Sequence, residues 1–136
     1  MEFHGVKVAL IFKDKLVMQH RDNKPGLLNS NMWDFPGGGR EGNETPVECA
    51  LREIQEEFGI KLEASSFVWQ KDYPAQKDPN QRAFFLVANI SKENVDAIHF
   101  GNEGQGWDFM DYNTFFERSD VVEAIKGRFR DYLDKK

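Results

Sequence analysis

Residues 45–59 carry both the start and the stop of one amphipathic helix, and they constrain the fold more than any other segment. Thr45 is suited to cap the helix, Pro46 follows where no backbone amide is needed, and Glu48 completes a capping box. Gly59 is suited to end the helix. Between these ends, apolar residues recur at helical spacing in one stripe, formed by Val47, Leu51, Ile54 and Phe58. We therefore expect this stripe to be buried.

A second face of the same helix is acidic. At about 100° per residue, Glu53, Glu56 and Glu57 lie within roughly 100° of one another. Like charges four residues apart repel, and carboxylates near a helix C-terminus oppose the helix dipole, each at a cost of a few tenths of a kcal/mol to about 1 kcal/mol. Arg52 is the only basic residue in the helix. The face is either a solvated acidic surface or a site for a divalent cation, because Mg²⁺ and Mn²⁺ prefer carboxylate oxygens.

Nine residues in and around this helix fit one spaced pattern, G-x5-E-x7-R-E-U-x-E-E-x-G-U, in which U is aliphatic. They are Gly38, Glu44, Arg52, Glu53, Ile54, Glu56, Glu57, Gly59 and Ile60. For a chain of this composition, a chance match at all nine positions has a probability on the order of 10^-7. Bound cations can neutralise a pyrophosphate, orient it and lower the pKa of an attacking water. A divalent cation held by these carboxylates could therefore promote hydrolysis of a phosphoanhydride bond.

Length and composition fit one small enzyme domain over residues 1–136, because 40% hydrophobic residues suffice for a core. A net charge of -5 argues against a general nucleic-acid binder, which usually presents a basic field. Cys49 is the only cysteine, which excludes a disulfide framework and a Cys-based zinc site. The apolar run near the N-terminus is too short for a membrane span, and no signal-peptide pattern follows it, so we expect a cytoplasmic protein.

Hydrophobic periodicity and turn residues predict strands on both sides of the helix. The predicted strands are 6–12, 16–20, 67–73, 83–90 and 107–110, with a short extended piece at 33–35. Residues 22–32 are predicted to form a loop, and residues 121–133 a closing amphipathic helix. Strands interleaved with two helices indicate an α/β fold with a mixed β-sheet between helices.

With these features the chain resembles the Nudix hydrolases, and more narrowly their compact MutT-like members. The nine-residue pattern is the Nudix box, while WDFPGG upstream and EGQGW downstream extend the similarity loosely over most of the chain. The resemblance implies the Nudix fold, an α/β/α sandwich around a mixed β-sheet. It implies substrates in which a nucleoside diphosphate is linked to another group, and Mg²⁺ as the cofactor, with Mn²⁺ as a substitute.

The resemblance also implies a metal site. Glu53, Glu56 and Glu57 would be metal ligands, with the Gly37 carbonyl as a backbone ligand. Glu103 corresponds to a loop glutamate that joins the metal site or assists the attacking water; the alternative is an ordinary turn carboxylate. For the general base, we prefer Glu53 and then Glu103.

Other residues of the pattern would support this site. Arg52 and Glu44 would hold the box together, and Arg52 would act in catalysis with Glu53, Glu57 and Glu103 by orienting a neighbouring carboxylate. A simple surface ion pair is the alternative for Arg52. Gly38, Glu44 and Gly59 would have structural roles.

Substrate choice depends on residues outside the pattern. Phe35 and either Phe84 or Phe85 are candidates for stacking on a base, at about 1 to 3 kcal/mol, with a core position as the alternative. Arg21 could meet a phosphate or a base. MutT-type enzymes that act on oxidised dGTP read the purine with an asparagine near the start of the last helix, but Ser119 and Asp120 occupy the comparable stretch here.

Three functions remain open from the sequence. The first is an Mg²⁺-dependent nucleoside triphosphate pyrophosphohydrolase that releases a nucleoside monophosphate and pyrophosphate. The second is an ADP-ribose or nucleoside-diphosphate-sugar hydrolase, which the position of Pro74 faintly favours. The third is a non-catalytic, nucleotide-binding regulatory domain, against which the complete set of carboxylates argues. For each we expect a small-molecule nucleotide ligand, no membrane or nucleic-acid partner, and a monomer or homodimer.

Overall fold

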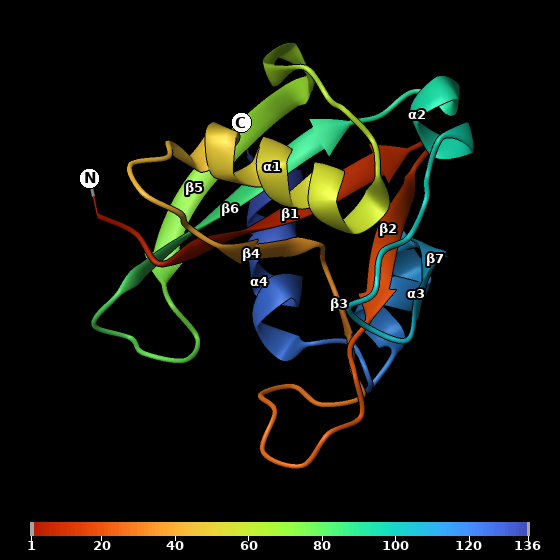
Figure 1. Cartoon of the computed structure of the whole chain (residues 1–136). Helices are drawn as coiled ribbons and strands as arrows, with labels where there is room; N and C mark the ends of the chain where they lie inside the picture. The colour runs from red at the N-terminus through yellow and green to blue at the C-terminus, as the bar shows by residue number, and fades with distance from the viewer. Residues whose placement is uncertain (1, 136) are drawn as a thin grey trace.

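The computed structural model describes residues 2–135 and is built around one seven-stranded mixed sheet (Figure 1). Five strands follow the order β3-β2-β1-β6-β5, while β4 pairs with β1 and β7 pairs with β2. The strands are β1 (Gly5–Phe12), β2 (Lys15–His20), β3 (Trp33–Asp34), β4 (Gly37–Gly39), β5 (Phe67–Pro74), β6 (Arg82–Asn89) and β7 (Gly106–Asp111). Only the β1·β6 pair is parallel among the named strands, so the sheet is mixed as predicted.

Helices cover both faces of this sheet, as Figure 1 shows for α1 in front and α4 behind. The α-helices are α1 (Pro46–Phe58), α2 (Lys92–Asp96), α3 (Tyr112–Glu117) and α4 (Glu123–Leu133), and a 3-10 helix spans Ala64–Ser66. The predicted α/β/α sandwich is confirmed. Within the described residues no helix combines the length and the apolar character needed to cross a lipid bilayer.

The α1 helix forms for the local reasons read from the sequence. The Glu48 amide donates to Thr45 Oγ1 at 3.1 Å and the Thr45 amide donates to Glu48 Oε1 at 2.8 Å, which is the predicted capping box. Gly59 ends the helix with a left-handed φ of 69°, and its amide donates to the Gln55 carbonyl. Ile54 is fully buried, and the other apolar residues of the stripe also pack into the core beneath the helix.

Two hydrophobic cores lie on opposite faces of the sheet, because side chains alternate along its central strand. Val6, Val8 and Leu10 of β1 point into the core beneath α1. Ala9 and Ile11 point into the other core, which α3 and α4 cover. The sheet therefore separates the acidic helix α1 from α4.

The strands β1 and β2 diverge after their hairpin, and this divergence positions the box. They pair only at Ile11 and Phe12 of β1, nearest the turn. Further along β1, residues 5–7 pair with the three glycines of β4. A side chain at Gly37 would overlap the Val6 carbonyl oxygen, so only glycine permits this close approach. The chain therefore passes from β3, which pairs with β2, to β4, which pairs with β1 beneath α1.

Two short helices and one helix boundary differ from the sequence-based expectation. Helix α2 begins at a capping box between Ser91 and Asn94, and α3 begins at Asp111, whose carboxylate accepts from the Thr114 amide. Both helices are too short to show an apolar period, and only their caps mark them. Val121, expected at the start of the last helix, instead forms an isolated parallel β-bridge with Trp33 of β3.

Candidate functional site

The acidic face of α1 lies directly over β4. A side chain at Gly38 would overlap the carboxylate of Glu53, so the backbone of β4 and this carboxylate are in contact. Burial raises the pKa of Glu53; Arg52 opposes the shift, while the negative charges of Glu56 and Glu103 add to it. Gly38 therefore keeps open the space that Glu53 occupies, which gives the structural role predicted for this glycine a physical basis.

Glu57 is the most deeply buried carboxylate of this face, with 9% of its surface exposed. Burial raises its pKa to about 7; the charges of Glu53 and Glu103 add to the shift, whereas Lys7 and a backbone hydrogen bond from Gly37 oppose it. Its Oε2 atom is the only fully buried side-chain polar atom without a hydrogen-bond partner in residues 2–135. Such an atom is costly unless another group binds it.

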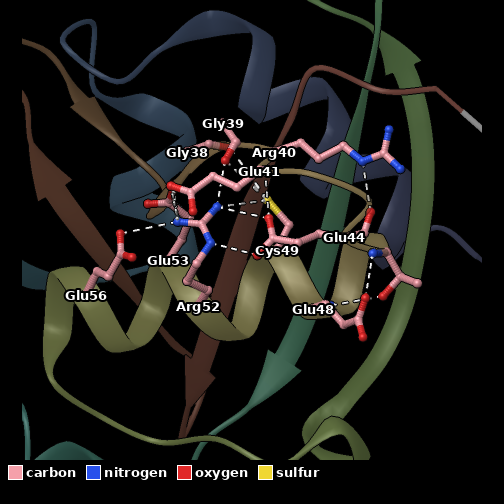
Figure 2. Close-up of polar contacts among 11 residues, drawn as sticks. Gly38, Gly39, Arg40, Glu41, Glu44, Glu48, Cys49, Arg52, Glu53 and Glu56 are labelled. Atoms are coloured by element: carbon pink, nitrogen blue, oxygen red, sulfur yellow. Dashed lines mark hydrogen bonds and ion pairs between the residues drawn. The ribbon is translucent and has the colours of Figure 1, made fainter.

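Arg52 joins the helix to the loop before it (Figure 2). Its Nε and Nη2 atoms donate to the two carboxylate oxygens of Glu44 at 2.7 and 3.0 Å, and Nη2 also donates to the Gly39 carbonyl at 2.7 Å. Its Nη1 atom donates to Glu53 at 3.1 Å and to Glu56 at 3.2 Å. This network exceeds a simple surface ion pair, and it orients the Glu53 carboxylate.

Glu44 anchors this arginine from the loop. Its hydrogen bonds with Arg52 lower the pKa of Glu44 to about 2, against the opposing effect of burial. Its Oε1 atom also accepts from the Glu41 amide at 2.8 Å. Glu44 is therefore ionised at neutral pH and fixes both the loop and the arginine.

Glu103 lies near the site, on the loop between α2 and β7. The Gly101 amide donates to the Glu57 carbonyl at 2.7 Å, and the Gln105 amide donates to the His20 carbonyl at 2.7 Å. The loop is thereby fixed to the end of α1 and to the end of β2. The exposed Glu103 side chain lies near enough to raise the pKa values of both Glu53 and Glu57.

The predicted metal ligands share one region but do not form a finished metal site. Within residues 2–135, no group of three or more His, Cys, Asp or Glu side chains is arranged to hold a metal ion as it stands. The Arg52 guanidinium donates hydrogen bonds to both Glu53 and Glu56, which partly balances the charge of these carboxylates. Glu56 is turned outward, with 57% of its side chain exposed. The oxygen-rich residues still fit a hard divalent cation, and the unpartnered oxygen of Glu57 is the clearest place for one.

A cleft of about 400 Å³ begins at Gly38 and Gly39 and extends over the α4 face of the sheet. Arg21 lines it, as expected for a substrate contact, and its Nη1 atom lies 3.7 Å from Asp34. Asp34 is buried and accepts from Lys7 at 2.8 Å. The substrate-binding role of Arg21 stays a prediction, now with a cleft beside it.

Base stacking on Phe35 and Phe85 does not fit the structure. Their side chains are 1% and 0% exposed, and their rings stack on each other at a centroid distance of 5.7 Å. Phe35 also stacks on Phe115 at 5.2 Å. Phe84 is likewise buried, on the α1 side. These rings belong to the cores, which is the alternative the sequence left open, because helices cover both faces of the sheet.

Several residues of the cleft lining were not assigned to the site from the sequence, among them Lys7, Asp34 and Arg128. Lys7 interrupts an otherwise apolar central strand, and Asp34 stands between two aromatic residues, so each carries a weak sequence signal. Arg128 belongs to a basic cluster on the last helix, for which the sequence favours a solvated face over a phosphate contact. Asp120, which lies in the stretch where MutT-type enzymes carry the purine-reading asparagine, is not part of the cleft lining. Both of its carboxylate oxygens accept from Arg118 at 2.7 Å.

Comparison with known proteins places this geometry in a family. The family model described as "NUDIX domain" matches residues 3–132. The 8-oxo-dGTP diphosphatase of Proteus vulgaris is 41% identical over 72 residues, which cover 48% of this chain and 62% of that relative. The RNA pyrophosphohydrolase of Francisella tularensis subsp. mediasiatica is 24% identical over 151 residues, which cover 96% of each protein.

A solved structure has the same fold. It is the bifunctional NMN adenylyltransferase/ADP ribose pyrophosphatase of Francisella tularensis complexed with AMP and a Mn ion. The TM-score is 0.71 at 21% sequence identity, and the similar region covers 98% of this chain and 42% of that chain. At this identity the similarity concerns the fold alone. Because the family model matches almost the whole length, the chain belongs to the NUDIX domain family.

Proposed function

We propose that this protein hydrolyses the phosphoanhydride of a nucleoside triphosphate and releases a nucleoside monophosphate and pyrophosphate. The observation that carries the proposal is the position of Gly38. Its backbone lines the cleft, and the position of its missing side chain is filled by the carboxylate of Glu53. A nucleoside in the cleft would therefore hold its phosphates beside the acidic face of α1.

The metal we propose is Mg²⁺, with Mn²⁺ as a substitute, held by Glu53, Glu56, Glu57 and Glu103 with the Gly37 carbonyl. When bound, it would neutralise phosphate charge and activate a water. The protein's own groups would do the rest. Arg52 holds the Glu53 carboxylate in place. Either Glu53 or Glu103 would accept the proton of the attacking water, with Glu53 preferred because it is buried and oriented.

Relatives support the reaction class more than the substrate. The two curated relatives are named for an oxidised deoxyguanosine triphosphate and for RNA, and the structural neighbour is named for ADP-ribose. All three names describe cleavage of phosphoanhydrides. The structural neighbour was crystallised with a Mn ion, which supports a divalent cation as cofactor.

The proline that faintly favoured ADP-ribose has a structural contact here. The carbonyl of Pro74 accepts a hydrogen bond from Arg128 at 3.0 Å. This contact uses the backbone and requires no ligand. The position of Pro74 therefore does not favour ADP-ribose or a nucleotide sugar as the substrate. The substrate panel below tests both alternatives.

A substrate panel with product analysis tests the proposed function. Purified protein with Mg²⁺ or Mn²⁺ is given canonical and oxidised dNTPs, nucleoside-diphosphate sugars, ADP-ribose and dinucleoside polyphosphates. We expect dNMP and pyrophosphate from a triphosphate, with orthophosphate appearing only after pyrophosphatase is added. Cleavage of ADP-ribose or a nucleotide sugar, without cleavage of any triphosphate, would support the second function. Nucleotide binding without any hydrolysis would support a regulatory domain.

A further inference from the structure

Arg128 is a buried cation without an ionic partner. It comes from α4, and only 9% of its surface is exposed. Its Nη2 atom donates to the Pro74 carbonyl at 3.0 Å, and its guanidinium lies over the Tyr73 ring, 4.9 Å from the centroid. Among the described residues, no carboxylate oxygen lies within 4.0 Å of it. Burying a charge in this way is unfavourable unless a ligand compensates it.

Arg128 lines the cleft and carries more donors than its one hydrogen bond uses. A guanidinium carries five N–H groups, and the contact with Pro74 uses one of them. In the described part of the chain, the one fully buried polar side-chain atom that lacks a partner belongs to Glu57, not to this arginine. The remaining donors therefore keep access to open space, and Arg128 is part of the cleft lining.

Close to Arg128, the cleft offers apolar walls that suit a flat group with hydrogen-bond acceptors. Ala124 and Ile125 precede it on α4, and Ala83 of β6 adds another small apolar wall. Among the described residues that line the cleft, Asp34 is the one carboxylate, and it already forms ion pairs with Lys7 and Arg21. The cleft thus combines apolar walls for a ring with a fork of unpaired donors beside them.

We propose that Arg128 determines base specificity by reading the acceptor edge of a guanine-type purine. Guanine offers O6 and N7 as neighbouring acceptors, which an arginine can contact together, whereas adenine places its N6 amino donor at the equivalent position. With the adenine amino group opposite the guanidinium, two hydrogen-bond donors would face each other and neither would have an acceptor. The inference rests on the proposed function, because it assumes that the cleft holds the base of the nucleotide.

The test is the ratio of kcat/KM for dGTP to kcat/KM for dATP in wild type and in Arg128→Gln. Arg130→Gln is the matched control, because Arg130 lies on the same helix over an aromatic ring but is exposed. We expect wild type to prefer dGTP, the ratio to fall about tenfold or more in Arg128→Gln, and the control to keep it. dITP, which retains O6 and N7, should behave like dGTP.

The ratio is unaffected by the fraction of correctly folded enzyme, because both substrates meet the same preparation. An unchanged ratio in Arg128→Gln, or a wild-type preference for dATP, would overturn the inference. If wild type hydrolyses no triphosphate, the proposed function fails. Titration with GMP and AMP then tests separately whether Arg128 recognises guanine. Stronger GMP binding that Arg128→Gln abolishes would support it, whereas equal affinities for GMP and AMP in wild type would overturn it.

Discussion

Glu57→Gln is expected to lower kcat by at least about a hundredfold, as for the loss of a metal or proton-transfer group. The amide keeps the shape of the side chain but removes the negative charge and one acceptor oxygen. In wild type, that buried oxygen has no protein partner. The substitution therefore removes the group that the proposed cation would bind, while it breaks no side-chain hydrogen bond of that atom.

The same variant is expected to be at least as stable as wild type at pH 8 without metal. The pKa of Glu57 lies near 7 in the folded protein, against an ordinary value of 4.5. Between these values, the folded state holds a proton that the unfolded chain has lost, so ionisation of Glu57 costs stability as the pH rises. Glutamine removes this cost.

Steady-state kinetics and thermal melts at pH 8 check both expectations. Glu63→Gln is the matched control, because Glu63 is exposed and makes no side-chain cap contact at its short helix. The control should leave kcat and Tm unchanged. Near-normal turnover in Glu57→Gln would remove Glu57 from the site, and a marked loss of Tm would show that the carboxylate stabilises the fold.

Gly38→Ala is expected to lower kcat about a hundredfold, because the new methyl group would displace the Glu53 carboxylate from the site. Displacements of about 1 Å at a catalytic group can have an effect of this size. The atoms that would have to move belong to a side chain, so Tm should change less than activity does. By contrast, Gly37→Ala would press against the backbone of β1 and should mainly impair folding.

Gly39→Ala is the control for this variant. At Gly39, the nearest atom to an added methyl group is the His4 carbonyl oxygen at 4.0 Å, an ordinary contact. Activity and Tm are measured for both variants under the same conditions. Equal kcat values in the two variants would show that the space beside Glu53 is not required for turnover.

The helix of the box was predictable because its signals are local. Thr45 and Glu48 cap each other across one turn, Gly59 lies at the stop, and the apolar stripe repeats within the helix itself. The contacts of Arg52 with Glu53 and Glu56 were also predictable, because these residues are its neighbours on the same helix. Its bonds with Glu44 and with the Gly39 carbonyl depend on how the preceding loop folds back onto the helix.

The cleft could not be predicted in the same way, because its residues come together only through the sheet. Lys7 and Asp34 are 27 positions apart, and Arg128 meets the Pro74 carbonyl across 54 positions. Burial of Phe35 likewise depends on α3 and α4 packing over the residue that follows β3. A single sequence shows the type of such residues but not their neighbours in space. The sequence therefore predicted the reaction, whose residues lie in one helix, more specifically than the substrate.

The central claim is that the acidic face of α1 binds the divalent cation needed for hydrolysis, and Mn²⁺ binding tests it without substrate. The free Mn²⁺ signal in electron paramagnetic resonance is titrated with wild type and with Glu57→Gln at pH 8. We predict saturable binding of at least one Mn²⁺ by wild type and an affinity at least about tenfold weaker in the variant. Equal Mn²⁺ affinities in the two proteins would contradict the claim.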